Sequence, residues 1–221
     1  MINIIHLKQK DKSRILLDDI NLTVPENTIF GILCEEKAER AALAESLSGV
    51  SSITEGKILI CDRSITTDRL GAQILIGYMP EAMSFYKNMT VIEFLSFITE
   101  IRQLDFQTSE KNIKEALTST GLIAVKDALI CNLSPAGKAR LGIAQAIVSN
   151  PSVLIFNNPT CDLNKNETQE IFKLIKSLCK AKSVIILSDN AQVFSFCDDG
   201  AIISLGKLDT NIQSFLGKGA K

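Results

Sequence analysis

Short apolar segments rich in Val, Ile and Leu alternate with longer segments of helical periodicity along this chain. Uninterrupted apolar segments of this length are typical of strands that are covered on both faces of a sheet. The expected strands are Ile2–Leu7, Ile15–Val24, Thr28–Leu33, Lys57–Cys61, Ile74–Met79, Ser152–Phe156, Ser183–Leu187 and Ala201–Leu205. Because strands that alternate with helices usually pair in parallel, this order predicts an α/β protein with a mainly parallel sheet.

The segment between the fifth and sixth expected strands carries helix signals. Thr90 is suited to cap a first helix, a second is expected over Ser109–Thr120, and a third ends by Pro151. The residues spaced to share one face of the first helix are Val91, Phe94, Leu95, Ile98 and Ile101. We therefore expect a single domain over residues 1–221, with a helical lobe at 81–150 inserted into an α/β core formed by 1–80 and 151–221.

The charge balance argues against two classes of partner. The chain has 24 Lys and Arg residues against 25 Asp and Glu, a formal net charge of −1, so no basic excess indicates nucleic acid or anionic lipid. No apolar run reaches the roughly 18 residues of a membrane-spanning helix, and the N-terminus lacks signal-peptide features. We expect a cytoplasmic location, no nucleic-acid partner and no direct membrane insertion.

The residue types that bind metals are scattered. The six cysteines form no C-x-x-C pair, and most are expected to be small buried apolar side chains. His6 is the only histidine and is expected to be structural. We therefore expect no metal site and no catalysis based on histidine.

Five separated segments resemble, in order and spacing, the ATPase family of ABC transporters. Ile20–Leu33 is similar to the strand before the phosphate loop of the family, and Ile76–Val91 is similar to its Q-loop. Leu133–Ala146 resembles the signature motif, and Asn150–Asn164 resembles Walker B and the D-loop. Ser183–Leu208 resembles the terminal strands. The resemblance implies a P-loop NTPase-like core with a mainly parallel sheet, an N-terminal antiparallel β subdomain and an inserted helical lobe. Pro80-Glu81 and the run Arg140–Ala146 resemble the exporter branch of the family.

The phosphate loop implied by this resemblance departs from the family pattern G-x-x-x-x-G-K-[ST]. Its candidate residues are Gly31, Cys34, Glu35, Glu36, Lys37, Ala38, Glu39, Arg40, Ala41 and Ala42. Cys34, Lys37 and Glu39 stand where the family has glycine, and a side chain there resists the left-handed turn that aims N–H groups at phosphate. Arg40 replaces the lysine, and Ala41 lacks the hydroxyl that would bind magnesium.

Three carboxylates, those of Glu35, Glu36 and Glu39, also stand where a polyanion would dock. Each would oppose a phosphate charge at ~4 Å by roughly 4 kcal/mol at an effective dielectric constant near 20. No cofactor is therefore expected, although that of the family is MgATP. The segment is typical of a solvated helix start in which the helix dipole favours Glu, and we also expect Glu35 or Glu36 to fill the former anion site; the two interpretations are compatible.

The remaining motifs show similar changes. Asn157 and Asn158 stand for the Walker B aspartate and glutamate, and an amide is neither negative nor basic. Loss of a general base alone lowers a rate by about 10²–10⁴, so hydrolysis is expected to be lost or very weak. The histidine of the switch loop corresponds to Ser188 or Asp189.

The signature motif and the D-loop bear on dimerisation, whereas the change in the Q-loop does not count for or against activity. The signature serine is present as Ser134, but Pro135 and Ala136 replace the glycines after it, and proline has no N–H to donate. Asp162 occupies the D-loop. Glu81 replaces the Q-loop glutamine, and we give that change no weight because the exporter branch tolerates it.

Three functions remain open at this point. The first is a catalytically degenerate subunit of an ABC transport system, of the export type, that docks an integral-membrane permease beside Glu81–Thr90 and pairs as a homodimer or heterodimer. The second is a slow but genuine ATPase with variant sites. The third is a soluble scaffold or regulator without a transporter.

Overall fold

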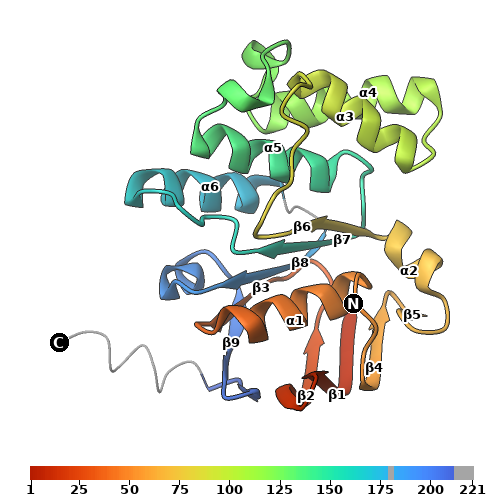
Figure 1. Ribbon diagram of the computed structural model, residues 1–221, viewed down its shortest axis with the longest axis vertical. Coiled ribbons are helices and arrows are strands. Elements are labelled where there is room, and N and C mark those ends of the chain that lie inside the picture. Colours follow the sequence, from red (N-terminus) through yellow and green to blue (C-terminus); the bar gives the residue numbers. More distant parts are fainter. Residues whose placement is uncertain (179–181, 212–221) are drawn as a thin grey trace.

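Two sheets organise the structure, a computed structural model that describes residues 1–178 and 182–211 (Figure 1). The six-stranded sheet has the order β10-β9-β3-β8-β7-β6, and only β10 is antiparallel to its neighbour. Its strands are β3 (Ile29–Cys34), β6 (Ile76–Met79), β7 (Val153–Asn157), β8 (Ser183–Ser188), β9 (Asp199–Ser204) and β10 (Lys207–Asp209). The expected mainly parallel sheet is confirmed.

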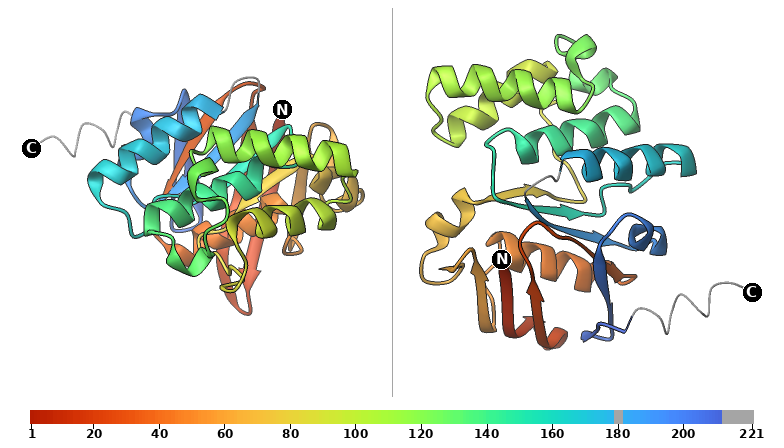
Figure 2. Two further views of the ribbon diagram at one scale, coloured as in Figure 1. Left: turned by 90° about the horizontal axis from the view of Figure 1, so that it is seen from above. Right: turned by 180° about the vertical axis from the view of Figure 1, so that it is seen from behind.

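An antiparallel four-stranded sheet of order β2-β1-β4-β5 forms the second β layer. It comprises β1 (Ile2–Asp11), β2 (Arg14–Val24), β4 (Glu55–Ile60) and β5 (Arg63–Ser64). Helix α1 (Lys37–Ser48) lies between the two sheets, as Figure 1 and the rear view in Figure 2 show. The antiparallel subdomain implied by the resemblance is therefore confirmed.

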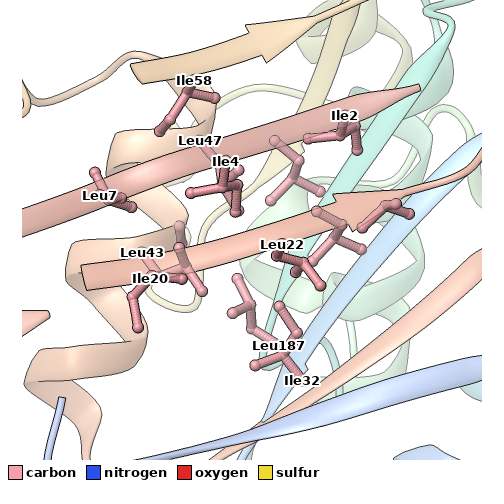
Figure 3. Packing of buried hydrophobic residues seen from close by; sticks show 14 of the residues in the cluster. Ile2, Ile4, Leu7, Ile20, Leu22, Ile32, Leu43, Leu47, Ile58 and Leu187 are labelled. Atoms are coloured by element: carbon pink, nitrogen blue, oxygen red, sulfur yellow. The ribbon is translucent and has the colours of Figure 1, made fainter. Parts of the chain in front are cut away.

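Packing around α1 joins these layers. Leu43 and Leu47 are four residues apart on α1 and are fully buried, because this spacing brings them onto one helix face. Figure 3 shows them among side chains of both sheets, including Ile4 of β1, Ile20 of β2 and Ile32 of β3. Burial of side chains of this size contributes about 1.5–3 kcal/mol each, so this cluster fixes where α1 begins relative to the end of β3.

The remaining helices lie on the other side of the six-stranded sheet, except α2 (Arg69–Ile74), which precedes β6 (Figures 1 and 2). They are α3 (Val91–Ile101), α4 (Phe106–Ser119), α5 (Pro135–Ile147) and α6 (Lys165–Leu178), with short 3₁₀ turns at Ile123–Val125, Ile130–Asn132 and Ala191–Ser195. Helices α3 to α5 share one apolar cluster, and we call them the helical lobe. None of the described helices combines the length and apolarity needed to cross a membrane.

The start of α3 agrees with the sequence. Thr90 caps the helix through a reciprocal pair of hydrogen bonds with Glu93, as expected. Ile101, the last residue of the helix, is 60% exposed, so the apolar face of α3 is not buried along its whole length. The second helix begins at Phe106 and not Ser109, because Asp105 accepts a hydrogen bond from the Thr108 N–H at 3.0 Å and acts as its cap.

Other elements also differ from expectation, among them the following. Ile74 ends α2, so the expected strand Ile74–Met79 begins two residues later, at Ile76. Asp68 accepts from Gly71 N–H and caps this short helix, which the apolar pattern alone does not indicate. Helix α5 ends at Ile147, four residues before Pro151.

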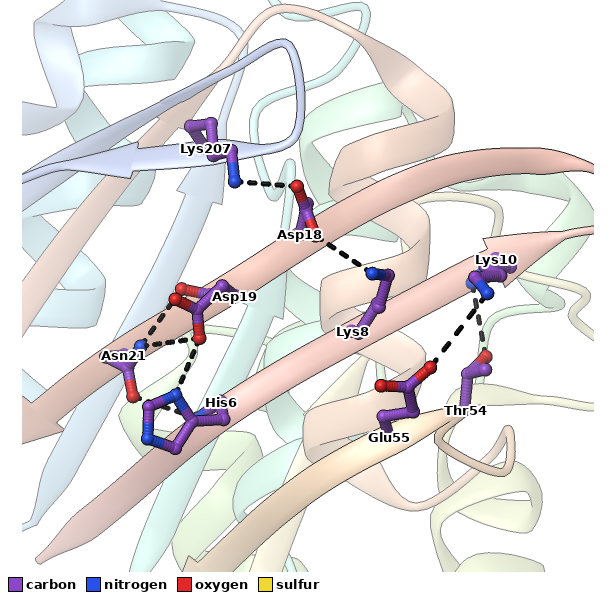
Figure 4. A network of polar contacts seen from close by, with 9 residues as sticks. All are labelled: His6, Lys8, Lys10, Asp18, Asp19, Asn21, Thr54, Glu55 and Lys207. Carbon is purple, nitrogen blue, oxygen red and sulfur yellow. Dashed lines mark hydrogen bonds and ion pairs between the residues drawn. The ribbon is translucent and has the colours of Figure 1, made fainter.

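The outer face of the antiparallel sheet carries ion pairs, drawn in Figure 4. Asp18 lies between Lys8, at 3.3 Å, and Lys207, at 2.6 Å, and these contacts lower the pKa of its carboxyl group. His6 Nδ1 lies 2.7 Å from Asp19 Oδ1. His6 therefore fastens β1 to β2 at an irregular point of their register, in line with the structural role expected for it.

The cysteines correct another expectation. Cys34 is buried, and burial raises the pKa of its thiol to about 12. Cys61 and Cys197 are half-buried, and Cys131 and Cys161 are exposed. Cys179 lies outside the described residues, so the expectation that most cysteines are buried is wrong for those described.

Gly77 allows the closest approach between β6 and the helical lobe. A Cβ atom at this position would overlap the backbone oxygen of Ala146 and would lie 2.8 Å from side-chain atoms of Pro151 and Leu154. We predict that Gly77→Ala lowers the free energy of unfolding by about 2 kcal/mol, measured by urea denaturation, because backbone cannot move aside cheaply. Gly137→Ala is the matched control: its Cβ meets nothing nearer than 3.4 Å, so we expect no loss. Equal stability of both variants would contradict the close packing.

Candidate functional site

A short connection joins β3 to α1. Only Glu35 and Glu36 separate the two elements, and Glu36 is the residue before the first helical turn, with φ −76° and ψ 117°. In this fully described stretch no residue from Cys34 to Ala42 has a positive φ. The connection is therefore an ordinary right-handed helix start, without the left-handed turn that glycines would allow.

Arg40 lies one turn into α1, and its side chain is only 2% exposed. Its Nη1 atom donates to the backbone oxygen of Cys34 at 2.7 Å, and its Nη2 atom donates to Glu81 Oε1 at 2.8 Å. Asp189 Oδ2 is 3.6 Å from Nη2. The guanidinium group thus has an internal counter-charge, which a buried cation requires.

Glu81 follows β6, and its side chain is 10% exposed. Besides Arg40, it accepts a hydrogen bond from Asn158 Nδ2 at 2.9 Å, and Lys37 Nζ lies 3.6 Å from its other oxygen. Burial raises the pKa of the Glu81 carboxyl group, but the hydrogen bonds from Asn158 and Arg40 and the nearby positive charges outweigh burial and leave the pKa below its ordinary value. Glu81 is therefore a carboxylate at neutral pH.

The two asparagines at the end of β7 are buried. Asn158 Nδ2 also donates to Asp189 Oδ2, at 3.0 Å. Asn157 is hydrogen-bonded to Tyr78, and burial raises the pKa of the Tyr78 hydroxyl to about 12. We call Arg40, Lys37, Glu81, Asn158 and Asp189 the Arg40 network. Three buried atoms around it have no hydrogen-bond partner: Arg40 Nε, Asn157 Oδ1 and Asn158 Oδ1.

The proposed role of Glu35 or Glu36 at the former anion site is wrong. Glu36 pairs with Arg14 of β2 at 2.6 Å, and Glu35 is exposed to solvent. The carboxylate that pairs with Arg40 belongs to Glu81, because the end of β6 lies beside the end of β7 and brings that side chain over α1. The residue that sequence analysis gave no weight is thus at the centre of the network.

Glu39 points to the other side of α1, under the turn between β9 and β10. Its side chain accepts a hydrogen bond from the Gly206 N–H at 2.9 Å, and the residue is 4% exposed. Burial and the charge of Glu36 raise the pKa of its carboxyl group. A groove of about 210 Å³ beside it is lined by Glu35, Glu36, Ile202 and Leu205, among others.

The remaining candidate residues make other contacts. Gly31 lies within β3 and packs against Cys197, and Ala41 and Ala42 lie on α1. Ser188 is buried and its hydroxyl accepts from Asn190 N–H, so Asp189 is the one of that pair that joins the network.

The signature-like residues form a helix start. Ser134 accepts from the Gly137 N–H at 3.1 Å and caps α5, whose first residues are Pro135 and Ala136. Asp162 is exposed in a turn after β7, with φ 62°. Among the described residues no group of three or more His, Cys, Asp or Glu side chains is placed to hold a metal ion.

A sheet whose carboxyl edge meets the start of α1, flanked by an antiparallel subdomain and a helical lobe, is the fold of an ATP-binding cassette. The family model described as "ABC transporter" matches residues 17–161. The chain therefore belongs to the ABC transporter family.

Individual relatives agree with this assignment. The chain is 30% identical over 207 residues to the methionine import ATP-binding protein MetN of Vibrio cholerae. The matched residues are 90% of this chain and 60% of the relative. It is 27% identical over 208 residues to the lipopolysaccharide export system ATP-binding protein LptB of Haemophilus influenzae, covering 92% and 86%. The chain thus spans about 60% of the length of its methionine import relatives.

Solved structures show the same fold. CbiO1 from Clostridium perfringens, described as part of the ABC transporter complex cbiONQ, has a TM-score of 0.84 at 23% identity, covering 98% of this chain and 91% of that one. The ATP-binding cassette MJ0796, in a dimeric structure bound to ADP and Pi, has a TM-score of 0.82 at 18% identity, covering 95% and 98%.

The contact between Arg40 and Glu81 can be tested by measuring how strongly the two residues depend on each other for their effect on stability. Glu81→Gln leaves the buried Arg40 charge without its nearest counter-charge, so we predict a loss of about 3 kcal/mol in the free energy of unfolding at pH 7, measured in urea. Because the pKa of Glu81 is lowered in the folded state, this difference is fully present above the ordinary glutamate pKa of 4.5. It shrinks as the pH falls through the lower folded-state value.

The double variant Arg40→Met with Glu81→Gln should recover much of that loss, since neither charge remains. Arg63→Met with Asp68→Asn is the control: this exposed pair, at 3.0 Å, is expected to contribute about 0.5 kcal/mol. If the losses in the free energy of unfolding caused by Arg40→Met and by Glu81→Gln simply add in the double variant, the two residues are not coupled.

Proposed function

We propose that this chain is a subunit of an ABC transport system that docks a membrane permease, a partner ATPase or both, without hydrolysing ATP itself. The observation that carries this proposal is the buried contact between Arg40 and Glu81. Arg40 stands where the family pattern has its phosphate-binding lysine, and a carboxylate of the same chain already neutralises it.

The residues around Arg40 do not suit a magnesium triphosphate. A triphosphate that reached Arg40 would have to displace Glu81 and would then lie near that carboxylate. The right-handed turn after Cys34 does not form a loop of converging N–H groups. Ala41 supplies no oxygen ligand for magnesium, and Asn157 supplies no charge.

A water-activating base is also lacking at the expected place. Asn158 cannot accept a proton at neutral pH, and its amide nitrogen is bonded to Glu81 and Asp189. Glu81 itself is held ionised by Arg40, with a lowered pKa that makes it a weak base. These features support a loss of hydrolysis and not merely a slower rate.

A groove at the opposite end of β6 supports the docking role. It encloses about 580 Å³ and is lined by residues of α2, the end of α3 and the loop after α1. Four of its apolar side chains are exposed: Val50 (56%), Leu70 (77%), Ile74 (70%) and Ile101 (60%). We call it the docking groove. Exposed apolar side chains gathered in one groove are typical of a protein-binding surface.

Charge indicates the chemistry of its occupant. Arg102, in the groove, and Arg69, beside it, donate hydrogen bonds only to backbone oxygens, and in the described part of the chain neither has a carboxylate partner. An apolar helix that carries an acidic residue would complement both features. We propose that this helix is a cytoplasmic segment of an integral-membrane permease, which would place the subunit at the cytoplasmic face of the membrane.

The aromatic residues of the expected contact region are used differently. Phe85 packs edge-on against Phe94, and Tyr86 packs edge-on against Phe97, with ring centroids 5.4 Å apart in each pair. These contacts hold the loop after Glu81 to the helical lobe. Tyr86 is still 55% exposed, so the permease contact expected beside Glu81–Thr90 stays a prediction. We place the proposed contact at the α2–α3 end of β6 because the exposed apolar side chains gather in the docking groove. Relatives named for import and for export both match. The proposal therefore concerns docking to a permease and not the direction of transport.

The loss of nucleotide binding is tested by isothermal titration of MgATP into the isolated chain. We predict no binding tighter than about 1 mM, an affinity of only roughly −4 kcal/mol. A catalytically regular ABC ATPase, titrated in the same buffer, serves as the positive control. Micromolar affinity, or phosphate release with the partner present above that of an Asn158→Ala variant, would favour a slow ATPase instead.

Docking is tested by capture of an ABC permease, and any permease gene adjacent to the gene for this chain supplies the candidate. Leu70→Glu removes apolar area and places a negative charge where an acidic segment is expected, so we predict at least a roughly tenfold loss of captured permease. Leu205→Glu is the matched control, because Leu205 is 89% exposed in the β9–β10 turn, outside the docking groove. Equal capture by both variants, or no capture by the parent chain, would count against docking at this groove.

A further inference from the structure

The two walls of the docking groove belong to different parts of the molecule. Val50, Leu70 and Ile74 come from the core, before β6, whereas Ile101 and Arg102 come from the end of α3 in the helical lobe. The shape of the groove therefore depends on how the lobe sits relative to the core. Any contact that fixes the lobe also fixes the groove.

Arg102 makes such a contact at the groove itself. It follows α3, and its guanidinium group donates to the backbone oxygens of Gln73 at 2.9 Å and Ile76 at 3.1 Å. Gln73 is in the last turn of α2, where carbonyl groups lack the regular N–H partner four residues further along the helix. One lobe side chain therefore satisfies core carbonyls on both sides of the junction between α2 and β6.

The core side of this contact is itself anchored. The Gln73 side chain donates to the backbone oxygens of Ser48 and Gly49, at 3.2 and 3.1 Å, where α1 ends. The connection thus runs from α3 through α2 to α1, and α1 is the helix packed between the two sheets. Movement of the lobe at this end would break hydrogen bonds of half-buried groups, which is costly.

The second contact lies at the other end of β6. Glu81 begins the chain segment that leads into the lobe, and it is held to the core by Arg40 and Asn158. Between the two ends, α5 packs against β6: a Cβ on Gly142 would lie within about 3 Å of side-chain atoms of Met79 and Met83. The lobe is thus fastened at both ends of one strand and along it.

We infer that the docking groove is permanently formed, because Arg102 and Glu81 hold the helical lobe to the core with partners from this chain alone. A lobe held by a bound nucleotide would loosen when the nucleotide leaves. Here both partners are covalently part of the chain, so the groove would receive its acidic, apolar helix in one fixed geometry. The inference rests on the proposed function only in taking the groove as the docking site.

The test is amide hydrogen exchange on the full chain, read in peptides that cover α3 and α4. We expect Arg102→Gln to speed exchange in these helices by roughly tenfold or more, while α1 and β3 change less. Glu81→Gln should also speed exchange in the lobe, but because it leaves Arg40 of α1 without its counter-charge, α1 and β3 should exchange faster in that variant too. Arg63→Gln, which breaks only the exposed pair with Asp68, is the control and should leave both regions unchanged. Millimolar MgATP should not alter exchange of the parent lobe.

Two results would overturn the inference: unchanged lobe exchange in both variants, or acceleration by Arg102→Gln that is equal in α1 and β3, which would show global destabilisation. Arg102→Lys is a second variant that keeps the charge but cannot reach both carbonyls, and it should give an intermediate effect. Tight binding of MgATP in the titration, with both contacts still slowing lobe exchange, would refute the loss of nucleotide binding and leave the fixed groove standing.

Discussion

The buried contact between Arg40 and Glu81 determines how the carboxyl edge of the parallel sheet is used. Parallel strands bring their carboxyl ends to one edge, where open α/β folds place their ligands. In this chain that edge carries Cys34 at the end of β3, Glu81 after β6, Asn158 after β7 and Asp189 after β8, and all four contact Arg40 or one another. The protein therefore fills with its own side chains the place where a ligand would supply charge.

This internal arrangement is not a perfect substitute. Arg40 Nε and the side-chain oxygens of Asn157 and Asn158 are buried without hydrogen-bond partners, and a partly satisfied polar network reduces stability. The cost is offset elsewhere by apolar packing of α1, where Leu43 and Leu47 are fully buried between two sheets. Because that packing fixes α1, Arg40 has little freedom to move away from Glu81, and the ion pair becomes a structural element of the fold.

The strand pattern and the resemblance together were sufficient to predict the sheet, the antiparallel subdomain and the helical lobe, because uninterrupted apolar segments specify buried parallel strands. The strand pattern and the resemblance were insufficient to predict the Arg40 network. Glu81 is 41 residues from Arg40 in sequence, so no local pattern connects the two residues. A signal was present: relative to the family pattern, Lys to Arg keeps a positive charge and Gln to Glu adds a negative charge that can pair with it.

Ile74 and Ile101 show what the apolar pattern does not specify. Helical and strand periodicity indicates which residues share a face, but it does not indicate whether a neighbour covers that face. Ile74 begins an expected strand and Ile101 shares one face of an expected helix, whereas the structure leaves them 70% and 60% exposed in one groove.

Exposure of large apolar side chains on opposite walls is unfavourable in water unless another molecule covers them. The same strand, β6, thus has at Glu81 a polar end whose charges are paired within the chain, and at the groove an apolar end that is exposed. That asymmetry supports the proposal that this chain acts through a bound protein and not through a bound nucleotide.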